Sequence, residues 1–317
     1  MVCFLIAVPL IAMAQRSIVV RRIGVLSPGV PDTTDEIRKG TEALRELGWI
    51  EGRNLLVERR YASNRLEQLQ PLAEELVRAK VDVIVPIGFS ATLAAKRATT
   101  TIPIVFVDAY DPLGSGLVTS LARPGGNVTG FSVVGPEVTA KYLTVLKELL
   151  PALTRFGVVG LATPLWRATR EQYDKTCRSL GIEPIFVEIA AADEIGSAIA
   201  QLTQQRAGAV VLRGDSFVYE HRLDIVAAAM KHSLPTISEN GEIVREAGAL
   251  LSYSVTRAEE DRRFASYIDR ILRGAKPGDL PVEQPTKFEL LINLNTAKAL
   301  GLTIPRSLLL LADEVIQ

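Results

Sequence analysis

Acidic and hydroxyl side chains recur in this sequence shortly after short apolar runs, where they could bind the charged groups of a ligand. Ser90 comes after the run at 83–87, and Asp108 and Asp111 follow the run at 104–107. The free backbone N–H groups of a helix start can hold an anion such as a carboxylate, and a helix is expected to begin at Ser90. A pair of carboxylates could hold an ammonium group. Each position also suits an ordinary helix cap or turn.

The second half of the chain repeats this placement. Thr163, Asp215, Glu239 and Asn240 each follow a later apolar run, and Ser27 follows an early one. Open α/β sheets bind ligands outside the carboxyl ends of their strands. Polar residues at several strand ends therefore favour a shared binding cleft over a set of unrelated caps and turns. We predict that all of these residues line a ligand site.

Two aromatic residues accompany these loops. Phe89 stands beside Ser90, and Trp166 stands three residues after Thr163, in a chain that is only 6% aromatic. Their rings could sandwich an apolar or aromatic part of a ligand. Local packing is the alternative interpretation, and for Trp166 it is favoured at least as strongly.

The sequence carries none of the short motifs that mark common enzyme classes. It contains no phosphate loop, no Gly-x-Gly-x-x-Gly after the first strand, and no Gly-x-Ser-x-Gly, His-Glu-x-x-His or Cys-x-x-Cys pattern. His221 and His232 are the only histidines, which leaves little room for a multi-histidine metal site. We therefore predict no catalytic residue, no cofactor and no metal. An α/β enzyme with an unfamiliar acidic site built on Asp108, Asp111 or Asp215 is the alternative.

Charge and length narrow the class of partner. The 36 basic residues equal the 36 acidic residues, so the formal net charge is zero. A neutral chain gives no electrostatic reason to expect nucleic acid or an anionic membrane surface as partner. The length of 317 residues suffices for two domains of ordinary size.

The N-terminus predicts export. An apolar run at 4–14 ends in Ala12-Met13-Ala14, which fits a secretory signal with cleavage after Ala14, although no basic residue precedes the run. Residues 1–14 are thus a predicted signal peptide, and the mature chain is expected to be periplasmic or otherwise extracytoplasmic. After cleavage Cys177 is the sole cysteine, and we expect a small packed thiol there.

Strands rich in valine and isoleucine alternate with amphipathic helices in two successive series that meet at the turn 124–127. The first series predicts strands at 22–26, 55–61, 81–87 and 104–107 and helices at 34–47, 66–78 and 90–98. The second predicts strands at 157–161, 184–189, 209–212 and 236–238 and helices at 139–149, 165–180, 193–205 and 218–231. The remainder predicts strands at 249–254 and 287–292 and helices at 258–272 and 296–300.

Several of these strands are apolar on both faces, which is typical of parallel sheets covered by helices on each side. We therefore predict an α/β protein of two Rossmann-like lobes. One lobe is assigned residues 15–130 and 252–283, and the other residues 131–251 and 284–317. Short hinge crossings are expected at 128–132, 250–254 and 281–286, and they would restrict the lobes to a hinge motion.

Three blocks of sequence resemble a known family. They read IPIVFV, DPLGSGLV and SLARPGGNVTG between 102 and 130, GAKPGDLPVEQPTKFEL at 274–290, and NTAKALGLTIP with ADEVI between 295 and 316. In combination they resemble the ABC-transporter substrate-binding proteins often labelled tryptophan/tyrosine-type, and the resemblance extends from residue 22 onward. Two segments at predicted cleft loops, 162–166 and 214–219, depart from the usual pattern of that family.

The resemblance implies a type I periplasmic-binding-protein fold, an extracytoplasmic receptor and an ABC permease as membrane partner. The function predicted on this basis is capture of a small ligand, such as an amino acid or related zwitterion, by closure of two lobes of a monomer. Ser90 would face the anionic end of the ligand, and Asp108 or Asp215 the cationic end. A ligand-sensing regulatory domain is a further alternative, but it would need a helix-turn-helix where residues 1–21 are largely apolar.

Overall fold

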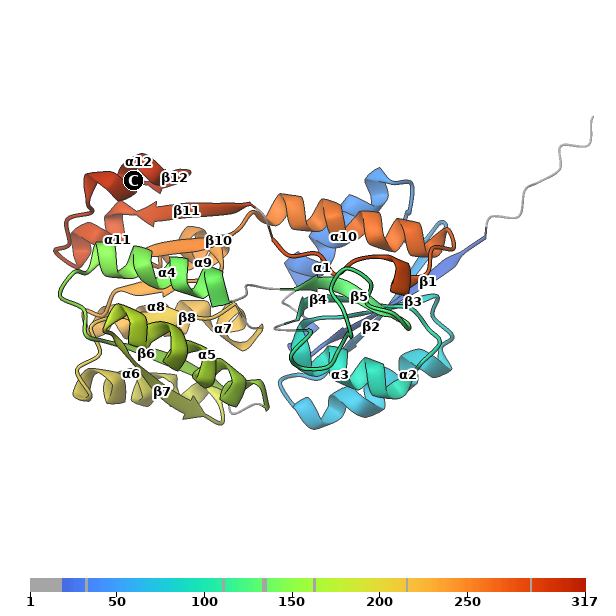
Figure 1. Cartoon of the computed structure of the whole chain (residues 1–317), viewed down its shortest axis with the longest axis horizontal. Helices are drawn as coiled ribbons and strands as arrows, with labels where there is room; N and C mark the ends of the chain where they lie inside the picture. The colour runs from blue at the N-terminus through green and yellow to red at the C-terminus, as the bar shows by residue number, and fades with distance from the viewer. Residues whose placement is uncertain are drawn as a thin grey trace, which may run out of the picture.

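The computed structural model describes residues 19–31, 34–109, 112–132, 136–161, 164–214, 216–285 and 287–317. The predicted signal peptide and three predicted site residues, Asp111, Thr163 and Asp215, lie outside these ranges. Figure 1 shows two α/β lobes side by side, each with its own sheet and its own helices.

The first lobe is built on a sheet of five parallel strands in the order β2-β1-β3-β4-β5. The strands are β1 (Arg21–Ser27), β2 (Leu55–Tyr61), β3 (Val83–Pro86), β4 (Ile104–Ala109) and β5 (Val128–Ser132). In β3 every side chain is buried, on both faces of the sheet. The run at 83–85, which is apolar on both alternating faces, therefore lies in a central parallel strand, as predicted.

Helices cover both faces of this sheet. Helices α1 (Thr34–Glu46) and α10 (Arg257–Leu272) form one layer, and the 3₁₀ turn η2 (Leu66–Gln68) with α2 (Leu69–Arg78) and α3 (Gly88–Ala98) forms the other (Figure 1). Helix α2 buries Leu69, Ala73 and Leu76, the face that the three-to-four spacing of the sequence predicts.

The second lobe is built on a seven-stranded sheet in the order β12-β11-β10-β9-β8-β6-β7. Its strands are β6 (Arg155–Leu161), β7 (Glu183–Ile189), β8 (Val210–Leu212), β9 (Thr236–Ser238), β10 (Leu251–Val255), β11 (Phe288–Asn293) and β12 (Glu314–Ile316). Pairing is parallel throughout except between β10 and β11. The predicted α/β architecture with mostly parallel sheets is confirmed in both lobes.

Two apolar cores flank the second sheet. On one face lie α4 (Pro136–Leu149), α5 (Pro164–Leu180), α11 (Leu294–Ala299) and α12 (Arg306–Leu311). On the other lie the 3₁₀ turn η3 (Ala192–Glu194), α6 (Ile195–Gln204), α7 (Ser216–Glu220), α8 (Arg222–Lys231) and α9 (Gly241–Ala247). No helix within the described ranges is both long enough and apolar enough to span a bilayer.

The structure differs from the predicted elements where segments are short. The predicted helix at 218–231 is two helices that meet at His221, and α9, α12 and β12 were not predicted. Helix α9 spans only seven residues between its cap, Asn240, and the left-handed Gly248 at φ 75°. A segment of that length carries too few apolar positions for periodicity to reveal it.

Strand pairing also places two lobe boundaries at other residues than the sequence predicts. Phe131 and Ser132 belong to β5 and thus to the first sheet, whereas residues 252–255 belong to β10 and thus to the second. The hinge crossings predicted at 128–132 and 250–254 are therefore strands within the two sheets. The chain passes between the sheets after β5, between β10 and α10, and between the 3₁₀ turn η4 (Pro277–Asp279) and β11.

Candidate functional site

Loops at the carboxyl ends of strands from the two lobes meet directly. Asn64 follows β2 in the first lobe, and its side-chain amide donates to Glu220 Oε2 at 2.8 Å. Glu220 lies in α7, which follows β8 in the second lobe. The strand-end loops thus face one another, which is the arrangement that ligand binding between two α/β lobes requires.

Ser27 is the last residue of β1 and is 3% exposed. Its Oγ accepts a hydrogen bond from the backbone N–H of Gly29 at 3.2 Å. The carbonyls of Pro28 and Gly29 in turn accept from the N–H groups of Asn64 and Ser63. Ser27 therefore shapes the first loop of the candidate site and ties it to the turn that carries Asn64.

Helix α3 begins two residues earlier than predicted. Gly88 has a left-handed φ of 75°, and Ile87 occupies the N-cap position without a side-chain hydrogen bond. Ser90 is consequently the third residue of the helix, so the alternative that it is an ordinary N-cap is wrong. A glycine at φ > 0 lets the chain turn sharply out of β3 and start the helix at once. Ser90 and Phe89 are both partly exposed in the first turn.

The end of β4 is irregular where Asp108 occurs. The pairing of β4 with β5 shifts register between Phe106 and Ala109, so that Asp108 lies within a bulged stretch. Bulges are common beside ligand sites because they redirect a strand's side chains. The backbone of Asp108 is described by this strand, while its side chain lies outside the described part of the structure.

Glu239 lies directly after β9 and binds two neighbours of its own lobe. Its Oε1 accepts from the Tyr173 hydroxyl at 2.7 Å, and its Oε2 accepts from the Gly214 N–H at 3.2 Å. Burial, reinforced by the nearby Glu239 carboxylate, raises the pKa of Tyr173 well above its usual value, so Tyr173 stays a neutral donor. Glu239 thus fixes the backbone immediately before Asp215, and Tyr173 is a supporting residue that the sequence analysis missed.

Asn240 caps a helix. Its Oδ1 accepts from the backbone N–H of Glu242 at 2.9 Å, and its own N–H donates to Ser238 Oγ at 2.9 Å. This is the ordinary N-cap arrangement at the start of α9. Asn240 thus has a structural role at this helix start, and its predicted contact with a ligand stays untested.

Trp166 belongs to the core of the second lobe. It is 4% exposed, and its ring stands edge-on to Phe186 with centroids 5.5 Å apart and planes at 83°. Gly160, on β6, makes room for the indole, because a Cβ built there would lie 2.8 Å from the ring. Trp166 therefore packs in the core, as the alternative interpretation predicts, and its contact with a ligand stays an untested prediction. No signal in the sequence pairs Gly160 with Trp166.

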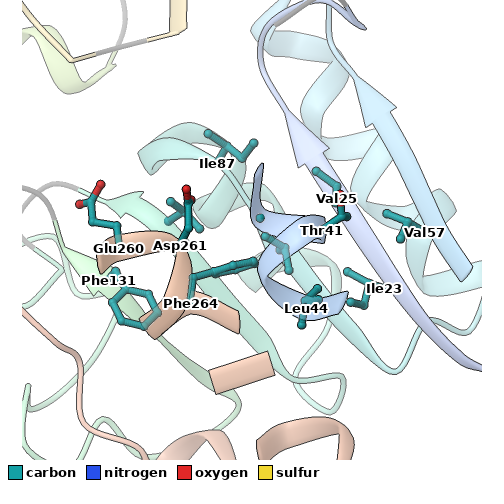
Figure 2. Close-up of a pocket in the computed structure, with 13 residues that line it drawn as sticks. Ile23, Val25, Thr41, Leu44, Val57, Ile87, Phe131, Glu260, Asp261 and Phe264 are labelled. Carbon is teal, nitrogen blue, oxygen red and sulfur yellow. The ribbon is translucent and has the colours of Figure 1, made fainter. Parts of the chain in front are cut away.

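A separate apolar pocket lies within the first lobe (Figure 2), between the sheet and helices α1 and α10. Apolar side chains such as Ile23, Val25 and Phe264 make up most of its wall. Its cavity of about 70 Å³ is roughly half the volume at which an engineered cavity accepts benzene. We interpret it as incompletely filled core rather than as the ligand site.

Metal binding finds no support in the described parts of the chain. Within them, no three histidine, cysteine, aspartate or glutamate side chains gather closely enough to hold a metal ion. The polar groups of the strand-end loops suit hydrogen bonding to a small organic ligand.

Comparison with known proteins gives a consistent family. A family model described as ABC transporter substrate binding protein matches residues 22–316. A relative named "Tyrosine-binding protein", from Clostridioides difficile (strain R20291), is 27% identical over 287 residues, which are 89% of this chain and 81% of that protein.

Two solved structures resemble this chain over both lobes. A conserved domain protein from Vibrio cholerae is 28% identical with a TM-score of 0.86, covering 93% of this chain and 99% of that one. An ABC domain from Streptococcus pneumonia, in complex with L-Trp, is 25% identical with a TM-score of 0.84, covering 94% of this chain and 100% of that one. The type I periplasmic-binding-protein architecture predicted from the sequence is confirmed. Scores this high over both lobes also mean that the lobes are arranged much as in the L-Trp complex.

Proposed function

The chain belongs to the family of ABC transporter substrate-binding proteins, and from this we propose that it captures an amino acid or related zwitterion between its lobes. Members of this family are extracytoplasmic receptors for small solutes, as the resemblance in the sequence implies. The observation that carries the proposal is the similarity to the L-Trp complex over 94% of this chain. The relative named for tyrosine binding supports the same class of ligand.

The charged ends of such a ligand would meet complementary groups. The first backbone N–H groups of α3 have no partner within the helix and carry its partial positive charge, which suits a carboxylate. The Ser90 hydroxyl, in the same turn, would donate a further hydrogen bond to that carboxylate. Asp108 in the bulged end of β4, or Asp215 before α7, would hold the ammonium group. Glu239 would act indirectly, because its contact with Gly214 positions the loop that carries Asp215.

The aromatic contact with the ligand would come from the first lobe. Phe89 is partly exposed beside Ser90, whereas Trp166 is buried in the core. Phe89 packs against the apolar cluster of the first lobe on one side. Its other side would contact the side chain of the ligand, and a large apolar or aromatic side chain would gain most from that contact.

The remaining parts of the proposal concern the role of the chain in the cell. It is exported with cleavage after Ala14, acts as a monomer, performs no catalytic step, and delivers its ligand to an ABC permease. The apolar run at 4–14 supports export, and the family membership supports the receptor role and the permease partner.

Isothermal titration with the twenty amino acids tests the ligand class, after native mass spectrometry has reported any small molecule that co-purifies. Loss of one charge-assisted hydrogen bond costs about 1.5–3 kcal/mol, roughly ten- to a hundredfold in affinity. We expect that loss for Ser90→Ala, Asp108→Asn or Asp215→Asn. Unchanged affinity in all three folded variants would remove these residues from the site, and recovery of a chemically altered ligand would favour an enzyme.

A further inference from the structure

A hydrogen bond joins the two lobes at a position that no predicted ligand-binding residue occupies. The side-chain amide of Asn64 donates to Glu220 Oε2 at 2.8 Å, across 156 residues of sequence. Asn64 follows β2, and Glu220 is the last residue of α7. A bond between these two residues forms only when the strand-end loops of the lobes approach one another.

The first-lobe end of this bond is held rigidly. Asn64 has a left-handed φ of 61°, and its backbone N–H donates to the Pro28 carbonyl at 2.7 Å. The adjacent Ser63, also left-handed at φ 49°, donates its N–H to the Gly29 carbonyl at 2.9 Å. The amide of Asn64 is therefore presented by a fixed turn that is bound to the loop after β1.

The second-lobe end is equally fixed. Phe217, Val218 and Tyr219 of α7 are 6%, 0% and 7% exposed, so the short helix is anchored in the core of its lobe. Helix α7 begins one residue after Asp215. The bond thus connects the β1 loop of one lobe with the helix that follows the Asp215 loop of the other.

We propose that the Asn64–Glu220 hydrogen bond is a closure latch that raises ligand affinity without touching the ligand. This latch rests on the proposed function in one respect, namely that a ligand binds between the lobes. A contact made only in the closed state shifts the open–closed balance toward closure by its own free energy. Because one partner is a carboxylate, the bond belongs to the stronger, charge-assisted kind.

Asn64→Gly tests the latch, because glycine keeps the left-handed backbone and removes only the amide. Ser63→Gly is the matched control, since it alters the neighbouring left-handed residue of the same turn and leaves the latch intact. We expect Asn64→Gly to weaken binding of L-tryptophan or L-tyrosine about tenfold, and Ser63→Gly to leave it within about twofold. Glu220→Gln, which retains an acceptor oxygen, should lose less than Glu220→Ala.

Small-angle scattering of the ligand-free proteins gives a readout that needs no ligand. The radius of gyration of Asn64→Gly should exceed that of the wild type, while Ser63→Gly should match the wild type. In a double-mutant cycle, Asn64→Gly should add almost nothing to Glu220→Ala. Equal behaviour of Asn64→Gly and Ser63→Gly in titration and scattering would overturn the latch. If no amino acid binds, the proposed function fails, and the scattering comparison alone decides on the latch.

Discussion

The Tyr267 hydroxyl lies 2.9 Å from Glu283 Oε1 and 2.8 Å from the carbonyl oxygen of Pro281, so that α10 holds the segment leading from the first lobe to β11. Arg263, one turn earlier on α10, contacts the other carboxylate oxygen of Glu283. The backbone of Glu283 also pairs with β5, accepting from Ser132 N–H at 3.0 Å. These contacts join all three passages between the lobes on the first-lobe side, because α10 itself follows the passage from β10.

Tyr267→Phe should weaken this junction between α10 and the Pro281–Glu283 segment without leaving a cavity in the core. The phenylalanine ring keeps the packing against Phe131, whose centroid lies 4.8 Å away, but Glu283 loses a donor. We expect the free energy of unfolding to fall by about 1–2 kcal/mol, measured by urea denaturation. Tyr61→Phe in β2 is the control, because its hydroxyl makes no hydrogen bond to any residue that the structure describes. An equal loss in both variants would show that the junction contributes nothing specific.

The thiol of Cys177 should be unreactive toward thiol reagents in the folded protein. It is 1% exposed, and burial raises the pKa of its thiol to about 12 from an ordinary value of 9.0. In protein that begins at Gln15, a thiol reagent at pH 8 should react only after denaturant is added. Because the unfolded thiol ionises first, Cys177 should also make stability decline as pH rises from about 9 toward 12. Rapid labelling of native protein at pH 8 would contradict this assignment.

The sequence predicted the fold better than the site, and particular residues show why. The apolar run at 83–85 identified a buried parallel strand because burial on both faces requires an apolar side chain at every position of the run. The site depends on single side chains whose partners are distant in sequence. Tyr173 and Glu239 meet across 66 residues, and the space for Trp166 is left by Gly160 on a strand, which no local pattern records. The sequence could not distinguish the cap role of Asn240 from a ligand contact, because both use the same residue types at strand ends.

The apolar pocket of the first lobe offers a stabilising substitution. Gly40 of α1 lines it, and a Cβ at this position would lie 3.5 Å from the Phe264 ring, an ordinary contact distance. Alanine in a helix interior is favoured over glycine by about 1 kcal/mol. Gly40→Ala should therefore raise the free energy of unfolding by about 1 kcal/mol in urea denaturation. Gly48→Ala, just after the same helix, should lower it, because Gly48 has a left-handed φ of 91°.

The variant Trp166→Phe tests whether Trp166 packs in the core or contacts the ligand. The indole Nε1 is buried without a hydrogen-bond partner among the described residues, so phenylalanine removes an unsatisfied donor while it loses packing against Phe186. These effects oppose one another, and we expect a net loss of about 1–2 kcal/mol in the free energy of unfolding. Affinity for L-tryptophan or L-tyrosine, measured by isothermal titration, should stay within about twofold, whereas Phe89→Ala should weaken it about tenfold. A tenfold loss of affinity in Trp166→Phe with unchanged stability would instead place Trp166 against the ligand.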